Sequence, residues 1–99
     1  MLDKKLKERI VKSISWRLAL PHYRVFIFGS RVTGNAKSRS DIDIGIESSE
    51  PIPLNIINDI KAELDEIPIL QKIDVVDFKV VDDDFRKVAL KNIEVIYEQ

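Results

Sequence analysis

The residues with the clearest chemical potential are two aspartates, Asp41 and Asp43, that stand two positions apart in a short segment of alternating isoleucines. Side chains at i and i+2 of a strand share one face of the sheet. Two carboxylates so close repel each other, and each raises the pKa of the other unless a cation lies between them. Mg²⁺ is the natural cation, because it is a hard ion that takes carboxylate and phosphate oxygens.

A second chemical signal precedes these aspartates, where Gly29 and Ser30 follow an apolar segment. Glycine lets the backbone approach a ligand closely, and serine can cap a following helix or donate its hydroxyl. The N-terminus of such a helix would offer free N–H groups to an anion. Basic residues follow nearby: Arg31, Lys37 and Arg39. A phosphate cradle beside paired carboxylates suits a magnesium-bound nucleoside triphosphate, and a second ion about 3.5–4 Å away would suit in-line displacement at phosphorus.

A two-metal site generally needs a third carboxylate, and the segment after residue 72 offers Asp74 and Asp77. These two aspartates lie on opposite faces of a strand because their spacing is odd. Asp74 leaves Ile73 and Val75 on the core face, so Asp74 is the preferred third ligand. Asp77 stays the alternative, because the register of a strand is easily misread.

Hydrophobic periodicity predicts the elements that would position these residues. Helices are expected over residues 3–20, closed by Pro21, over residues 54–66, and after the acidic run 82–84, whose charges suit the first turn of a helix. Strands are expected over residues 23–28, 41–47, 73–81 and 93–97. The second of these has an isoleucine face and a face that carries Asp41, Asp43 and Gly45. This order, without hairpin signals, predicts an α+β fold: a mixed β-sheet with packed helices.

Length and composition limit the number of domains, the kinds of metal site and the classes of partner that the chain can have. The 99 residues predict a single domain spanning residues 1–99, and a domain this small leaves room for a partner or a homo-oligomer to add stability. There is no cysteine and only one histidine, so thiolate and His-rich metal sites are excluded. The longest apolar run is too short for a membrane span and the charged N-terminus is no signal peptide, so no membrane contact and a cytoplasmic location are expected. A net charge of −1 predicts no direct nucleic-acid binding.

The motif of Gly29-Ser30, ten further residues, Asp41-x-Asp43 and a downstream Asp74 resembles the signature of the polymerase-beta-like nucleotidyltransferase superfamily. The run from Gly29 to Gly34 and the short length most resemble its minimal nucleotidyltransferase (MNT) branch. Members of that branch pair with HEPN-domain proteins in prokaryotic toxin–antitoxin modules. The resemblance covers residues 23–78 and implies a nucleotidyltransferase fold. Where many relatives carry arginine before Gly34, this chain has Thr33.

The resemblance also implies an activity: transfer of a nucleotide from a triphosphate, here ATP, to a hydroxyl, with two Mg²⁺ ions in the active complex. The implied nucleotide-binding residues are Gly29, Ser30 and Arg31. The implied catalytic and metal-binding residues are Asp41, Asp43 and Asp74, of which the last helps to deprotonate the attacking hydroxyl. In the MNT branch the acceptor is a tyrosine hydroxyl of the HEPN partner, and AMP transfer silences the RNase activity of that partner.

We compare two hypotheses for the function of this chain. The first is an adenylyltransferase that modifies a HEPN toxin and so acts as its antitoxin. The alternative is a non-catalytic antitoxin that neutralises the HEPN partner by binding alone, which gives no reason to retain three converging carboxylates. The sequence shows no added domain for the base or the acceptor, so the partner is expected to supply much of that surface. Base preference, the number of nucleotides transferred and the oligomeric state stay open.

Overall fold

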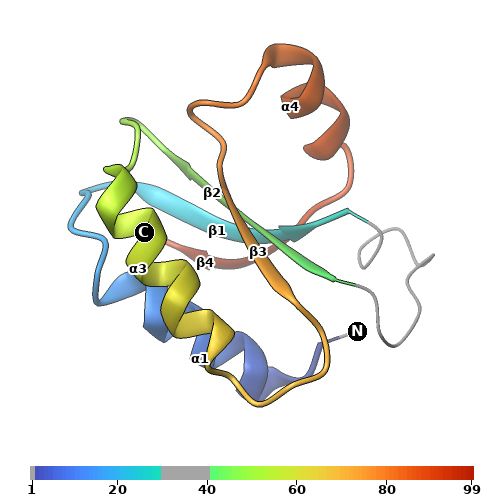
Figure 1. The fold of residues 1–99 in the computed structure, drawn as a ribbon. Helices are drawn as coiled ribbons and strands as arrows, with labels where there is room; N and C mark the ends of the chain where they lie inside the picture. The colour runs from blue at the N-terminus through green and yellow to red at the C-terminus, as the bar shows by residue number, and fades with distance from the viewer. Residues whose placement is uncertain (1, 30–40) are drawn as a thin grey trace.

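The computed structural model describes residues 2–29 and 41–99, and its elements follow the predicted order (Figure 1). The helices are α1 (Lys4–Ser15), α3 (Leu54–Asp65) and α4 (Asp83–Ala89). The strands are β1 (Tyr23–Phe28), β2 (Ile42–Ser48), β3 (Ile73–Asp77) and β4 (Glu94–Glu98). No helix within these two ranges is long and apolar enough to cross a membrane.

The four strands form one mixed sheet in the order β3-β2-β1-β4, which confirms the α+β prediction. Strand β1 lies antiparallel to β2 and to β4, whereas β2 and β3 run parallel. A parallel pair needs a crossover connection, and α3 provides it between β2 and β3. The sheet therefore brings β2 and β3 side by side although 24 residues, 49–72, separate them in the chain.

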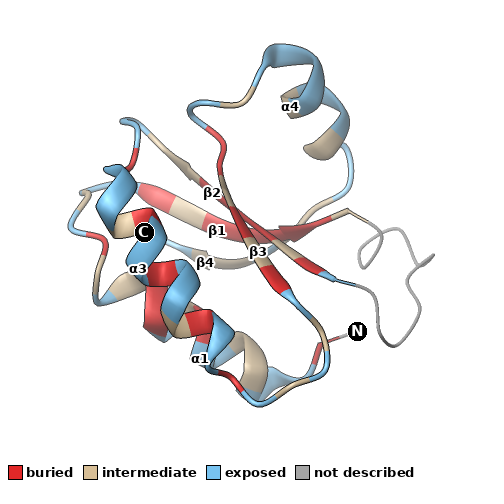
Figure 2. Cartoon of the chain, in the orientation of Figure 1, coloured by how far each residue is buried: buried red, intermediate tan, exposed pale blue. Residues whose placement is uncertain are grey.

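Helices α1 and α3 lie together on one side of the sheet and α4 lies on the other (Figure 1). The main core forms under α1 and α3, where the isoleucines of β2 meet the apolar stripes of both helices (Figure 2). Fully buried members of this core include Ile10, Ile14, Ile44, Ile46 and Ile60. Burial of such side chains is worth about 1.5–3 kcal/mol each, so this face supplies most of the hydrophobic stabilisation.

The opposite face of the sheet holds a second cluster built from phenylalanines. Phe26, Phe28 and Phe78 are buried together, and their ring centroids lie 4.8–6.1 Å apart in edge-to-face geometry. Gly45 lies beneath these rings, because a Cβ there would lie 2.7 Å from the Phe78 ring and closer still to that of Phe26. Gly45 therefore lies on the face away from the isoleucines, as predicted, and that face is covered by aromatic rings at this residue.

Two predicted boundaries are corrected. Helix α1 ends at Ser15 instead of residue 20, because the chain turns there and buries Leu18 in the main core. Strand β3 ends at Asp77 and not at residue 81, because the chain turns after the Asp77 carboxylate accepts a hydrogen bond from the Lys79 backbone N–H. The acidic run does begin a helix, as predicted: the Asp82 carboxylate accepts the Phe85 backbone N–H at 2.8 Å.

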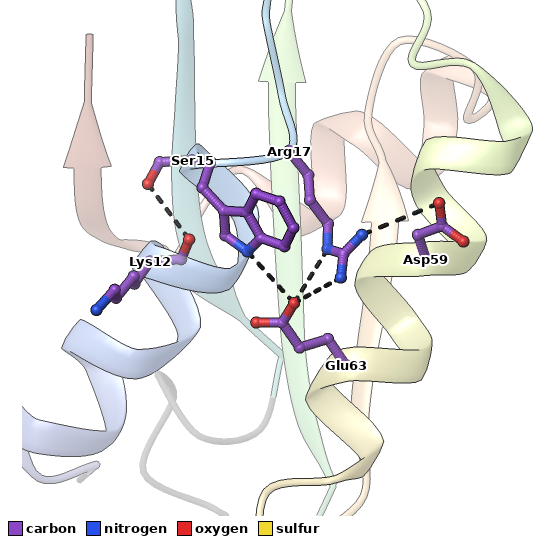
Figure 3. Close-up of polar contacts among 6 residues, drawn as sticks. Lys12, Ser15, Arg17, Asp59 and Glu63 are labelled. Carbon is purple, nitrogen blue, oxygen red and sulfur yellow. Dashed lines mark hydrogen bonds and ion pairs between the residues drawn. The ribbon is translucent and has the colours of Figure 1, made fainter.

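A polar cluster connects the end of α1 to α3 (Figure 3). The Arg17 guanidinium donates two hydrogen bonds, of 2.8 and 3.0 Å, to one carboxylate oxygen of Glu63. The Trp16 indole N–H donates to the same oxygen at 3.3 Å, and the Arg17 guanidinium lies 4.3 Å from the centroid of the Trp16 ring. Trp16 is thus held in place although it is 65% exposed, whereas Tyr23 is buried in the core.

Candidate active site

The carboxylates predicted to do chemistry meet at one end of the β2–β3 pair. Asp43 in β2 is the direct partner of Asp74 in β3, and Asp41 lies immediately before β2 at an exposed position. Phe28 in β1 is the partner of Asp43 on the other side, so Phe28, Asp43 and Asp74 form one row across the sheet. The two aspartates of the row lie on the phenylalanine face, away from α1 and α3.

The charges on these side chains affect one another. Partial burial raises the pKa of the Asp43 carboxyl above its usual range, and the negative charges of Asp74 and Asp41 raise it further. Desolvation and nearby like charges both disfavour the ionised form of a carboxylic acid. Asp43 is therefore the carboxylate whose negative charge a cation would stabilise most.

Asp74 and Asp77 have different surroundings, and these decide which of them can reach Asp43. Asp74 alternates with the buried Ile73 and Val75, so its side chain lies on the face of Asp43. Asp77 is buried on the opposite face, where its two carboxylate oxygens accept the backbone N–H groups of Ile52 at 2.8 Å and Lys79 at 2.9 Å. The structure places Asp74 beside Asp43 and gives Asp77 a structural role.

Gly29 closes the site from the end of β1. Its φ of +80° lies in the left-handed region that L side chains rarely adopt. A Cβ at this position would lie 2.6 Å from the Asp43 Oδ2, so a side chain there would displace the carboxylate. Gly29 is therefore required both by its backbone conformation and by the approach of Asp43. The other predicted nucleotide-binding residues, Ser30 and Arg31, lie outside the described residues, as does Thr33.

The donor set suits a hard divalent ion, because carboxylate oxygens are the ligands that Mg²⁺ takes. Within residues 2–29 and 41–99, however, no three acidic or histidine side chains converge closely enough to hold an ion. The Asp74 carboxylate lies 3.8 Å from the Lys72 ammonium, which neutralises part of its charge. Mutual repulsion opposes convergence of three carboxylates without a cation.

The phenylalanine cluster beside the carboxylates did not emerge from sequence reasoning. Phe26 and Phe28 alternate with Val25 and Ile27, and that alternation was available as a signal that β1 has an aromatic face. Residues 25–28 are all apolar, and such a run hides the difference between the two faces of a strand. Phe85 of α4 joins the cluster, with its ring centroid 6.0 Å from that of Phe28.

Comparisons with known proteins agree with this geometry. The sequence profile described as polymerase beta nucleotidyltransferase matches residues 23–99. The chain belongs to this nucleotidyltransferase family. It is 38% identical over 99 residues to the "Probable protein adenylyltransferase MntA" of Haemophilus influenzae, covering 99% of this chain and 86% of that protein.

Two solved structures show the same fold at low sequence identity. The first is a tri-AMPylated HEPN toxin in complex with MNT antitoxin from Shewanella oneidensis, matched with a TM-score of 0.76 at 13% identity, over 99% of this chain and 74% of that chain. The second is a toxin–antitoxin complex with AMP-PNP, matched with a TM-score of 0.70 at 16% identity, over 94% and 73%. The chain therefore has the nucleotidyltransferase fold that the resemblance implied.

Proposed function

We propose that this nucleotidyltransferase transfers AMP from ATP to a tyrosine hydroxyl of a HEPN-domain toxin, and thereby acts as the antitoxin of that toxin. The observation that carries the proposal is the side-by-side placement of Asp43 and Asp74, with the Asp43 carboxylate against Gly29. The relative from Haemophilus influenzae, with 38% identity along nearly the whole chain, supports AMP transfer to a protein. The Shewanella oneidensis complex supports a HEPN toxin as the acceptor.

In this proposal each site residue has a separate task. Asp41, Asp43 and Asp74 would hold two Mg²⁺ ions, which when bound would supply the positive charge that phosphoryl transfer requires. Asp74 accepts the proton of the tyrosine hydroxyl. The hydroxyl oxygen then forms a bond to the α-phosphorus of ATP, the bond between the α-phosphorus and its bridging oxygen to the β-phosphate breaks, and pyrophosphate leaves with the electron pair.

The phosphate chain of ATP would lie against Gly29, Ser30 and Arg31. Gly29 leaves its backbone uncovered at the point where the Asp43 carboxylate approaches, so phosphate oxygens and carboxylate can share cations there. Ser30 and Arg31 would add a hydroxyl donor and a guanidinium, which binds phosphate through paired hydrogen bonds.

The direct test is transfer of label from ATP to the HEPN partner. With Mg²⁺, ATP labelled at the α-phosphate should label the partner, whereas ATP labelled at the γ-phosphate should not. Asp41→Asn and Asp43→Asn should each abolish the transfer. If no α-label moves, and both variants neutralise the RNase activity of the partner as well as the wild type does, the chain neutralises by binding alone.

A further inference from the structure

A groove follows the border between α1 and α3 on the outer surface of these two helices. It consists of two hollows, of about 470 and 430 Å³, which share Arg9 and Glu63. We call it the α1–α3 groove. Three basic residues of α1 line one side and three acidic residues of α3 and its C-cap line the other: Lys5, Arg9 and Lys12, and Asp59, Glu63 and Glu66.

The two helices carry opposite charge. Helix α1 has five basic residues and one acidic residue, Glu8, whereas α3 has three acidic residues and one basic residue, Lys61. The three basic residues of the groove follow one another at spacings of four and three, and so do the three acidic ones. Residues at these spacings are neighbours on one face of a helix. A basic stripe therefore lies beside an acidic stripe of the same spacing.

An exposed tryptophan lies in the groove next to these stripes. Trp16 lines the groove and is 65% exposed. Its indole N–H donates to Glu63 at 3.3 Å, and the Arg17 guanidinium lies 4.3 Å from its ring centroid. Tryptophan and arginine are the residue types that most often dominate the binding energy of protein interfaces. A side chain that is already held in place loses little conformational entropy on association.

The charge pattern of the groove is complementary to itself. A twofold axis along the groove places α1 of one copy on α3 of a second copy, and the same operation makes the reciprocal contact. Rotation about such an axis keeps each residue at its own height along the groove. Each basic stripe therefore lies opposite an acidic stripe with the same spacing, and Trp16 of both copies lies in the same interface.

We propose that the α1–α3 groove binds a second copy of this chain, so that two copies form a symmetric dimer with α1 of each against α3 of the other. Each helix has 12 residues and is about 18 Å long. A contact between two pairs of such short helices is small for a specific interface, so we expect a weak dimer with a dissociation constant of about 10–100 μM.

Other occupants fit the groove less well. A nucleic acid would meet the acidic stripe as well as the basic one, and its phosphates are repelled by carboxylates. A HEPN partner must bring its tyrosine to Asp43 and Asp74, which lie on the other face of the sheet, away from α1 and α3. The proposed dimer leaves that face of both copies open.

The experiment reverses the charge of one stripe at a time. Arg9→Glu with Lys12→Glu makes α1 acidic at the groove, and Asp59→Lys with Glu66→Lys makes α3 basic there. Glu63 is left unchanged because it holds Trp16 and Arg17 in place. Sedimentation equilibrium measures the self-association of each variant and of an equal mixture of the two, and circular dichroism confirms that each variant is folded.

The control reverses two charges of α3 outside the groove. Lys61 and Asp65 are exposed, and neither lines the groove. Lys61→Glu with Asp65→Lys should therefore associate as the wild type does. The wild type is also measured in about 0.1 M and about 1 M salt, because the screening length falls from about 10 Å to about 3 Å between them.

The expected result is loss of the dimer in each reversal variant and its recovery in the mixture. Either variant alone should associate at least about tenfold more weakly than the wild type, because both of its helix contacts then join like charges. In the mixture, the acidic α1 of one variant meets the basic α3 of the other, and the two unchanged helices also have opposite charges. The mixture should therefore form a heterodimer about as stable as the wild-type dimer.

A second measurement needs no variant. Trp16 is the only tryptophan of the chain, so tryptophan fluorescence reports on the groove alone. Its emission maximum should move to longer wavelength when the wild-type protein is diluted through the dissociation constant, and the midpoint should rise in high salt. An emission maximum that does not change while sedimentation shows dissociation would place the interface elsewhere.

Several results would overturn the proposed dimer. A wild type that stays monomeric at about 1 mM protein would refute it, since that is at least tenfold above the expected dissociation constant. Loss of the dimer in both reversal variants without recovery in their mixture would exclude pairing of α1 with α3. A monomeric wild type whose reversal variants lose AMP transfer to the HEPN partner would assign the groove to that partner. A monomeric wild type that binds RNA through Arg9 and Lys12 would assign it to nucleic acid.

Discussion

Asp43 carries an energetic cost that only its proposed task explains. Burial and the charges of Asp74 and Asp41 raise its pKa, so ionised Asp43 opposes folding near neutral pH. A carboxyl whose folded-state pKa is raised contributes stability below its unfolded pKa, about 3.9, and loses it as pH rises through the folded value. The folded protein is therefore strained in this row above that value, as residues arranged for ligands often are.

Replacing Asp43 by asparagine should relieve this strain. We expect Asp43→Asn to raise the melting temperature of the metal-free protein at pH 7, while AMP transfer is lost. The gain should shrink as pH falls through the raised folded-state pKa of Asp43 and should vanish below the unfolded value of about 3.9. Scanning calorimetry at several pH values measures the effect. Asp65→Asn, an exposed substitution at the end of α3, should leave the melting temperature nearly unchanged. A lower melting temperature for Asp43→Asn at pH 7 would contradict this account.

Asp74 and Asp77, three residues apart on one strand, should separate function from stability. Asp77→Asn removes the acceptor of one of two backbone N–H groups: that of Ile52, in a buried hydrogen bond, or that of Lys79, in a partly buried one. It should cost about 1–3 kcal/mol in unfolding free energy. Asp74→Asn changes a side chain that is 44% exposed and should alter stability little, yet it should abolish transfer. Urea unfolding and α-label transfer per folded molecule measure both. If Asp77→Asn abolished transfer and Asp74→Asn lowered stability instead, Asp77 would be the third carboxylate.

At the scale of elements, patterns of neighbouring residues predicted the features that neighbouring residues determine, namely helix caps and the faces of strands. The Asp82 cap, the alternation of Ile73, Asp74 and Val75, and the isoleucine face of β2 each follow from residues adjacent in the chain. Contacts between segments that are distant in the sequence could not be predicted from these patterns. Gly45 leaves room for the rings of Phe26 and Phe78, which come from other segments. The residues next to Gly45 in the sequence do not indicate this contact. The roles of Asp41, Asp43 and Asp74 in chemistry stay predictions.

The contact between α1 and α3 should depend on pH through Glu63. Hydrogen bonds from Ser13 first, and then from Arg17 and Trp16, lower the pKa of the Glu63 carboxyl below its ordinary 4.5. Figure 3 shows the contacts of Arg17 with Glu63. A lowered carboxyl pKa contributes stability above the unfolded value and loses it as pH falls through the folded one. Because Glu63 is partly exposed, we expect about 0.5–1 kcal/mol, or a few degrees in melting temperature.

The measurement is the difference in melting temperature between the wild type and Glu63→Gln across pH 3 to 7. The difference should be largest above about pH 5 and should shrink toward pH 3. Glu66→Gln, at the exposed C-cap of the same helix, is the matched control and should show little difference at any pH. A Glu63→Gln penalty that does not change with pH would assign the contribution of Glu63 to packing instead of charge.

The two faces of the sheet have different roles in the whole molecule. Helices α1 and α3 bury the main core on one face, whereas α4 on the other contributes no buried residue. The row of Asp43 and Asp74 lies on the face that α4 covers, and α4 itself is exposed or half-buried along its length (Figure 2). Segments with few buried apolar contacts open locally at a lower free energy than the core. The face proposed to bind nucleotide can therefore rearrange around its ligand while the other face keeps the fold intact.

Hydrogen exchange of backbone amides can test this division. Amides of α4 should exchange at least about tenfold faster than those of β1, because α4 opens without unfolding the main core. ATP with Mg²⁺ should slow exchange in α4, because the proposed nucleotide site lies on the same face of the sheet. If the amides of α4 exchanged as slowly as those of β1, α4 and the main core would unfold together as one cooperative unit. In that case binding at the carboxylate row would depend on the stability of the whole sheet, and substitutions under α1 would weaken ATP binding as strongly as those in α4.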